Sequence, residues 1–115
     1  MIESIVYEFL KENMTVPVYM EIPENPPVKM IVLEKTGSSL DNFIKRSTFA
    51  IQSYGKSLYE AAELNETLKE IMMDGLDGLL SLGEISAVNL NSDYNFTDTT
   101  TKRYRYQAVF DIVHY

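Results

Sequence analysis

The chain contains no cysteine, and its single histidine, His114, is the penultimate of 115 residues. The absence of cysteine excludes disulfide bonds, thiolate metal sites and a cysteine nucleophile. A catalytic or metal-binding histidine needs a second ligand or an orienting partner, and the sequence has no second histidine. We therefore expect His114 to be a packed or an edge histidine of the last strand.

Motifs for nucleotide binding and nucleophilic catalysis are also missing. The sequence has no G-x-G-x-x-G, no Walker loop and no G-x-S-x-G. Asp74, Asp77 and Glu84 are close in the sequence, but their spacing does not match the ligand positions of a calcium-binding loop. We interpret them instead as residues at the end of a helix. We expect no catalytic residues, no metal ion and no cofactor, and we do not expect an enzyme.

Long hydrophobic runs and an excess of basic residues are absent as well. No apolar run approaches the roughly 20 residues of a membrane span, and the N-terminal residues are acidic where a signal peptide is basic. We expect an intracellular, soluble protein with no membrane partner. The formal net charge is −7 and the pI about 4.6. Such a surface repels phosphate backbones, so specific nucleic-acid binding is not expected.

Two helices are predicted. Residues 1–13 carry apolar side chains at helical spacing, namely Ile2, Ile5, Val6, Phe9 and Leu10. The second helix begins after Ser57, because a hydroxyl followed three residues later by Glu60 is a capping box. It ends at residues 74–78, which contain two glycines.

Five strands are predicted, over residues 16–22, 30–33, 46–54, 84–91 and 102–115. Pro17 places the first at an edge, and the unbroken apolar run of the second predicts burial on both faces. In the last strand, the even positions from Tyr104 to Ile112 predict a core face, and the odd positions, which include Arg105 and Gln107, predict a solvent face. Residues 23–27 read as a stiff turn, residues 38–45 as a polar turn, and residues 89–101 as a polar run without apolar period.

The order helix, three strands, helix, two strands predicts one α+β domain over residues 1–115. We expect a mostly antiparallel sheet of about five strands with both helices packed on one face.

Aromatic and arginine side chains alternate in residues 91–106. This composition suits single-stranded nucleic acid, but Arg and Tyr are also enriched at protein interfaces, and the acidity of the chain favours a protein. A mobile surface hairpin with ordinary cross-strand pairs remains an alternative. The candidate subunit or partner interface residues are Tyr94, Phe96, Arg103 and Arg105, with Pro26 and Pro27 from the stiff turn.

Four segments together resemble the small tail-terminator proteins of long-tailed, non-contractile bacteriophages. They are V-P-V-Y-M-E-I-P after the first helix, I-V-L-E-K-T-G, Q-S-Y-G-K-S-L-Y-E-A-A-E-L at the second helix, and the closing R-Y-R-Y-Q-A-V-F-D-I-V-H-Y. These proteins belong to the head-tail joining, or minor capsid, proteins of phages and prophages of Gram-positive bacteria. The segments cover nearly the whole chain.

The resemblance implies a structural virion protein that forms a ring, usually a hexamer, at the head-proximal end of the tail tube. Its partners would be its own copies, the tail-tube protein and the head-tail connector, and DNA would pass through the ring without specific binding. A neck or head-closure component is the first alternative. A host-directed acidic module that mimics DNA is the second, although a mimic would need its acids in one contiguous patch.

Overall fold

The computed structural model describes residues 1–41, 44–75, 83, 85–101 and 103–115 of an elongated molecule with extents of 43 × 24 × 24 Å. Its elements are α1 (Ile2–Asn13), β1 (Val18–Tyr19), β2 (Met30–Asp41), β3 (Ile44–Gly55), α2 (Leu58–Asp74), β4 (Ile85–Asn95) and β5 (Tyr104–His114). This order confirms the predicted α+β fold.

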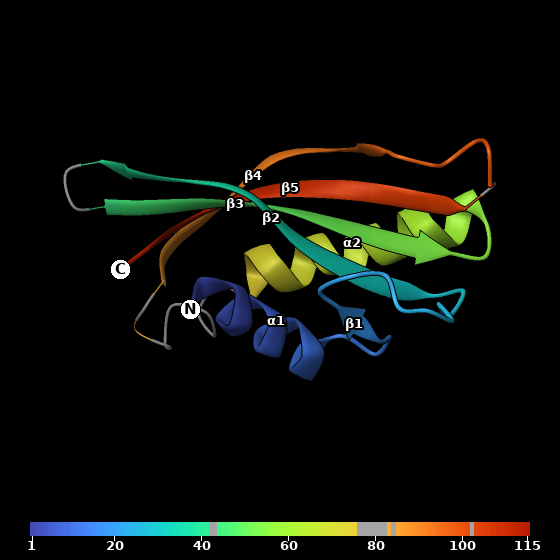
Figure 1. Ribbon diagram of the computed structural model, residues 1–115, viewed down its shortest axis with the longest axis horizontal. Helices are drawn as coiled ribbons and strands as arrows, with labels where there is room; N and C mark the ends of the chain where they lie inside the picture. The colour runs from blue at the N-terminus through green and yellow to red at the C-terminus, as the bar shows by residue number, and fades with distance from the viewer. Residues whose placement is uncertain (42–43, 76–82, 84, 102) are drawn as a thin grey trace.

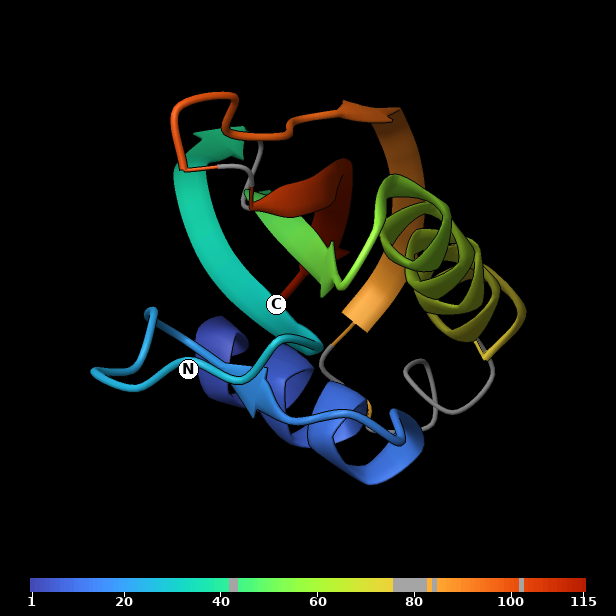
Figure 2. The ribbon, with the colours of Figure 1, turned by 90° about the vertical axis from the view of Figure 1, so that its right-hand side faces the viewer.

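The five strands form one sheet in the order β1-β2-β3-β5-β4. Strand β1 runs parallel to β2, and the other neighbours are antiparallel. Both helices lie on the same side of the sheet (Figure 1). Seen end-on, the sheet curls, with β2 and β4 on opposite sides of the central strands (Figure 2). The sheet therefore has a helical face, covered by α1 and α2, and an open face.

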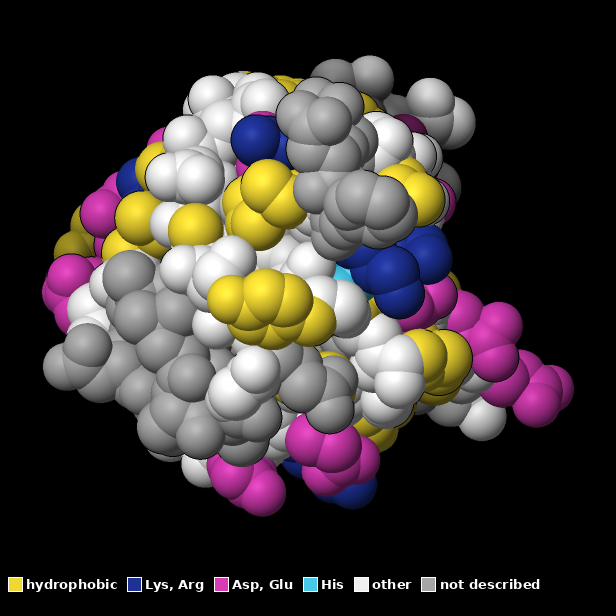
Figure 3. Space-filling view, turned by 90° about the vertical axis from the view of Figure 1, so that its left-hand side faces the viewer, with side chains coloured by type: hydrophobic (Ala, Val, Ile, Leu, Met, Phe, Trp, Pro, Cys, Tyr) yellow, Lys and Arg dark blue, Asp and Glu magenta, His cyan; other side chains and the backbone are white. Residues whose placement is uncertain are grey.

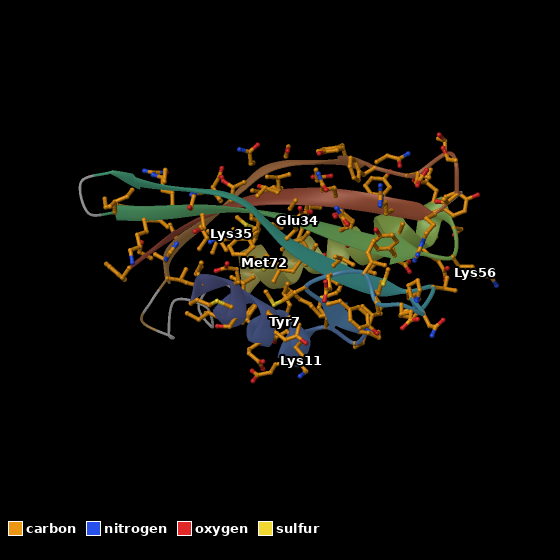
Figure 4. All side chains as sticks on the ribbon, in the orientation of Figure 1. Tyr7, Lys11, Glu34, Lys35, Lys56 and Met72 are labelled. Atoms are coloured by element: carbon orange, nitrogen blue, oxygen red, sulfur yellow. The ribbon has the colours of Figure 1, made fainter. Side chains whose placement is uncertain are left out.

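The main core lies between the helices and the helical face. Val6 and Leu10 of α1 and Leu68 and Met72 of α2 have no exposed surface, as expected for residues three and four positions apart on one side of a helix. Met72 lies between α2 and the sheet (Figure 4). The sheet contributes Ile31, Leu33, Phe49, Ile51, Ala108, Phe110 and Ile112. Neither described helix has the length and apolar character that a membrane crossing requires.

The predicted start of α2 is confirmed. The Glu60 backbone N–H donates to Ser57 Oγ over 3.2 Å, and the Lys56 backbone N–H donates to Glu60 Oε2 over 3.0 Å, which is the reciprocal capping box. Gly55 permits the tight passage from β3 into this helix, because a Cβ atom there would lie 2.5 Å from the Ala61 backbone nitrogen.

The first predicted strand is wrong in length. Only Val18–Tyr19 forms a strand, in place of residues 16–22; Pro17, directly before it, has no backbone donor for the sheet. Its predicted edge position is confirmed, and the Pro17 carbonyl accepts a hydrogen bond from the Ile31 N–H over 2.9 Å.

The beginning of β2 is buried on both faces, as the unbroken apolar run predicted. Ile31 and Leu33 belong to the main core. Met30 and Val32 point to the open face and pack with Tyr54 in a second, smaller cluster.

The polar turn predicted at residues 38–45 is wrong. Strand β2 continues to Asp41 and β3 begins at Ile44, with Leu40 paired with Lys45; residues 42–43 lie outside the described residues. Backbone hydrogen bonds to a neighbouring strand hold this hairpin without any apolar period. The first part of the polar run of residues 89–101 is also a strand. Strand β4 extends to Asn95 and is paired with β5, and this pairing again needs no apolar period.

Some predicted boundaries fall on residues that the structure does not describe. Two predicted strands begin at Glu84 and Lys102, which lie outside the described residues. Residues 76–78 of the predicted helix end, which include Asp77, also lie outside them.

A candidate protein interface at one end of the sheet

The structure brings the aromatic and arginine residues singled out in the sequence into one connected group. The rings of Tyr94 and Phe96 meet edge to face with centroids 5.8 Å apart. The guanidinium carbon of Arg105 lies 4.5 Å from the Phe96 ring centroid, and Arg105 Nε donates to the Phe96 carbonyl oxygen over 2.7 Å. The end of β4 is thereby fixed to the beginning of β5.

Tyr54, at the end of β3, is the centre of this group. Its side chain is buried, with 1% of the residue exposed. The guanidinium carbons of Arg103 and Arg105 lie 4.9 and 5.8 Å from its ring centroid, within the range of cation–π attraction. We call Tyr54, Tyr94, Phe96, Arg103 and Arg105 the Tyr54 cluster.

A chain of hydrogen bonds runs through the cluster in one direction. Arg105 Nη1 donates to the Tyr54 hydroxyl over 2.9 Å, and that hydroxyl donates to Gln52 Oε1 over 3.3 Å. Gln52 Nε2 donates to Gln107 Oε1 over 3.0 Å, and Gln107 Nε2 donates to the Tyr94 hydroxyl. A guanidinium can only donate, so Arg105 stands at the donor end of the chain. The Tyr94 hydroxyl accepts the last of these hydrogen bonds.

This arrangement corrects one expectation about β5. Gln107 was predicted on a solvent face, but it is 8% exposed. Gln52 and Tyr94, which lie opposite Gln107 on the two neighbouring strands, flank it, and its amide forms hydrogen bonds to both. At this end of the molecule, hydrogen-bonded polar side chains therefore cover the face of the sheet that the helices leave open.

The two predicted prolines border the cluster. Pro26 and Pro27 line a pocket of about 360 Å³ together with Tyr54, Lys56 and Arg103. The remaining lining residues are Val28, Gly55 and Tyr104. Lys56 projects at this end of the molecule (Figure 4). All six predicted interface residues thus lie in one region, although they come from three separate segments.

The turn that leads into Arg103 is ordered by Asp98. Its Oδ1 accepts hydrogen bonds from the backbone N–H groups of Thr100 and Thr101, over 2.9 and 3.4 Å. These bonds, the one from Thr100 first, lower the pKa of the Asp98 carboxyl. The backbone N–H of Asp98 donates to the Arg103 carbonyl over 3.2 Å, so the turn holds the start of β5 in place.

The opposite end of the molecule also exposes apolar and basic side chains. Leu40, Ile44 and Tyr115 are exposed there, and Lys45 and Arg46 line a second pocket with His114. Figure 3 shows basic side chains beside the histidine on this end. His114 Nε2 is 2.8 Å from Ser47 Oγ, and Ser47 is buried, so a hydrogen bond joins the end of β5 to β3.

Tyr54, Gln52 and Lys56 were not identified as site residues from the sequence. Tyr54 and Gln52 sit on β3, whose register against β5 brings Tyr54 opposite Arg105 and Gln52 opposite Gln107. That pairing cannot be read from a single strand. Within the described residues, no group of three or more acidic or histidine side chains could hold a metal ion.

No protein-family model matches the chain, and no curated protein sequence matches it significantly.

Proposed function

We propose that this chain is a structural assembly protein of a bacteriophage or prophage virion. In this proposal it forms a ring, hexameric as the resemblance implies, at the head-proximal end of the tail tube. The ring stops tail polymerisation and joins the tail to the head connector. The proposal rests on the resemblance of the four sequence segments to tail-terminator proteins and on the character of the Tyr54 cluster.

The Tyr54 cluster is the observation that carries the proposal. Tyr94 and Phe96 are 42% and 38% exposed, yet both are held by contacts to Arg105 or Gln107. Aromatic and arginine side chains that are fixed before binding lose little conformational entropy in a contact, and they are enriched at the energetic centres of protein interfaces. Such a surface favours a role in protein assembly.

The charge of the chain suits a ring that surrounds DNA. A net charge of −7 per copy, repeated around a ring, repels the phosphate backbone. DNA would then pass the ring without being held. Arg103 and Arg105 lie over the aromatic rings of Tyr54 and Phe96. This arrangement favours a contact with a protein over a contact with DNA.

The exposed row of acids on α2 favours the DNA-mimic alternative, because it gathers Glu63, Glu66 and Glu70 on one helix. Lys69 interrupts the row with an ion pair to Glu66 at 2.6 Å, and a mimic of a phosphate backbone needs uninterrupted negative charge. A neck or head-closure component uses the same kind of ring surface, so it is separated from a terminator only by experiment.

Electron microscopy of particles from a phage or prophage that lacks this gene tests the proposal. Overlong tails without heads are expected, because polymerisation would have lost its stop. Tails of normal length beside separate heads would assign the protein to the neck instead. Intact infectious particles would refute the structural role.

A further inference from the structure

The pocket that Tyr54 and Arg103 share with Pro26 and Pro27 combines basic and apolar side chains. Its described lining includes two cationic side chains, Lys56 and Arg103, and no acidic one. Arg103 lies with its guanidinium carbon 4.9 Å from the Tyr54 ring centroid. Neither cation forms an ion pair within the described part of the chain. Their N–H groups are therefore available to a ligand.

Arg103 is held on a rigid support. Tyr54 is buried and its hydroxyl is hydrogen-bonded to Arg105 and Gln52. A guanidinium placed on such a ring keeps its fork of N–H donors free for a carboxylate. The walls from Pro26, Pro27 and Val28 are apolar, so they suit the aliphatic stem of a glutamate.

The same chain carries the matching surface. Glu63, Glu66 and Glu70 are exposed on α2 at positions i, i+3 and i+7, which places them on one side of the helix. Only Glu66 among the three has an ion-pair partner in the described residues, Lys69 at 2.6 Å. We call these three residues the α2 acidic ridge.

We propose that the pocket of one copy binds the α2 acidic ridge of a second copy. This inference rests on the proposed ring function and identifies the two halves of its subunit contact. The pocket and the ridge share no residue, so each copy offers both surfaces at once. A contact between two different surfaces of identical chains is heterologous, and repeated contacts of this type close into a ring when the rotation allows it.

A second copy fits the pocket better than a nucleic acid does. Phosphate backbones are bound along extended basic tracks, whereas Lys56 and Arg103 share a pocket with apolar walls. The acids that would repel DNA are the ones that the pocket would accept. The pocket could also bind another acidic protein. Measuring whether this protein binds isolated tail tubes through the pocket distinguishes such a partner from a second copy.

Sedimentation of the purified chain at low ionic strength, over a range of protein concentrations, tests the contact. The wild type is expected to self-associate and to dissociate as salt is added, because ion pairs are screened. Two variants reverse the charge of one surface each: Arg103→Glu for the pocket, and Glu63→Lys with Glu70→Lys for the ridge. Each alone is expected to weaken association by about tenfold or more.

An equimolar mixture of the two variants is expected to recover association. The reversed pocket of one variant then meets the reversed ridge of the other, and the unchanged surfaces meet as well. Lys11→Glu and the pair Glu8→Lys with Glu12→Lys are the matched controls, since they change net charge equally on α1. They are expected to associate as the wild type does.

A wild type that stays monomeric at every concentration and salt would overturn the inference, as would a mixture that fails to recover. If Arg103→Glu instead abolishes binding of the monomeric chain to isolated tail tubes, the pocket serves another protein and the self-contact is wrong. These outcomes leave the proposed function standing, because tail length in the deletion strain is measured independently. Overlong tails with a monomeric protein would refute only the contact.

Discussion

Arg105 Nη1 donates a hydrogen bond to the Tyr54 hydroxyl over 2.9 Å, although the two residues are 51 positions apart in the sequence. The bond joins the start of β5 to the end of β3, and Gln52 continues it toward Gln107. Tyr54 therefore contributes both to packing and to the proposed interface. It fills the small cluster with Met30 and Val32, and it supports the arginines of the proposed interface.

Tyr54→Phe is expected to lower the free energy of unfolding by about 1–3 kcal/mol, because it leaves a part-buried arginine donor and a buried amide acceptor without their partner. Urea denaturation measures the change. Tyr59→Phe is the control, since Tyr59 is 76% exposed and should leave the free energy unchanged. Equal stability of the two variants would show that the hydrogen-bond chain contributes nothing to folding.

Gly55→Ala is expected to destabilise the protein by about 1–3 kcal/mol. The new Cβ atom would lie 2.5 Å from the Ala61 backbone nitrogen and 2.8 Å from the Glu60 carbonyl carbon, so the first turn of α2 would have to move. Gly37→Ala is the matched control, because a Cβ atom added there would have no neighbouring atom within 4 Å. Its effect should stay within about 0.5 kcal/mol, and a similar loss at both sites in thermal unfolding would contradict the close packing at Gly55.

Glu3 is expected to make stability sensitive to acid. Hydrogen bonds from its own backbone N–H and from Lys35 lower the pKa of Glu3 below its ordinary value of 4.5, and Lys35 Nζ lies 3.2 Å from its carboxylate. A lowered folded pKa stabilises the fold above the unfolded pKa, and this contribution is lost as the pH falls through the folded value.

Glu3→Gln should therefore lose less stability than the wild type between about pH 6 and about pH 3. The difference is expected to be below about 1 kcal/mol, because the ion pair is partly exposed. Denaturation at both pH values measures it, with Glu8→Gln as the control at an exposed position of the same helix. Parallel pH profiles for Glu3→Gln and the wild type would contradict the stabilising role of the pair.

The triple variant Tyr94→Ala, Phe96→Ala, Arg103→Ala is expected to fold but to fail in assembly. It removes the two exposed aromatic side chains of the Tyr54 cluster together with Arg103, and keeps Tyr54 and Arg105. Complementation of the deletion strain should restore less than about a tenth of the wild-type yield of particles, since such residues dominate interface energies. The control is Met20→Ala with Tyr59→Ala, which removes exposed side chains elsewhere. Full yield from the triple variant would remove the cluster from the interface.

The periodic parts of the fold could be predicted from the sequence, and the parts fixed by pairing could not. Ser57 and Glu60 predict the start of α2 correctly, because a capping box is local. The paired residues Leu40 and Lys45 resemble a turn in the sequence, because backbone pairing with a neighbour leaves no apolar pattern. The alternation of β5 predicts an exposed Gln107, because the side chains that flank it, Gln52 and Tyr94, belong to the two neighbouring strands.

The candidate site shows the same division. Composition identified Tyr94, Phe96, Arg103 and Arg105, and the structure joins them. Tyr54 could not be found, because its role depends on the register of β3 against β5.

The most direct measurement is the length of tail tubes that grow from purified tube protein with and without this chain. Electron microscopy with a label on the chain gives both the length distribution and the position of the protein. We expect tubes that stop growing and carry the label at one end only. Tubes of unchanged length, or label spread along the tube, would contradict the proposal that this protein ends tail polymerisation.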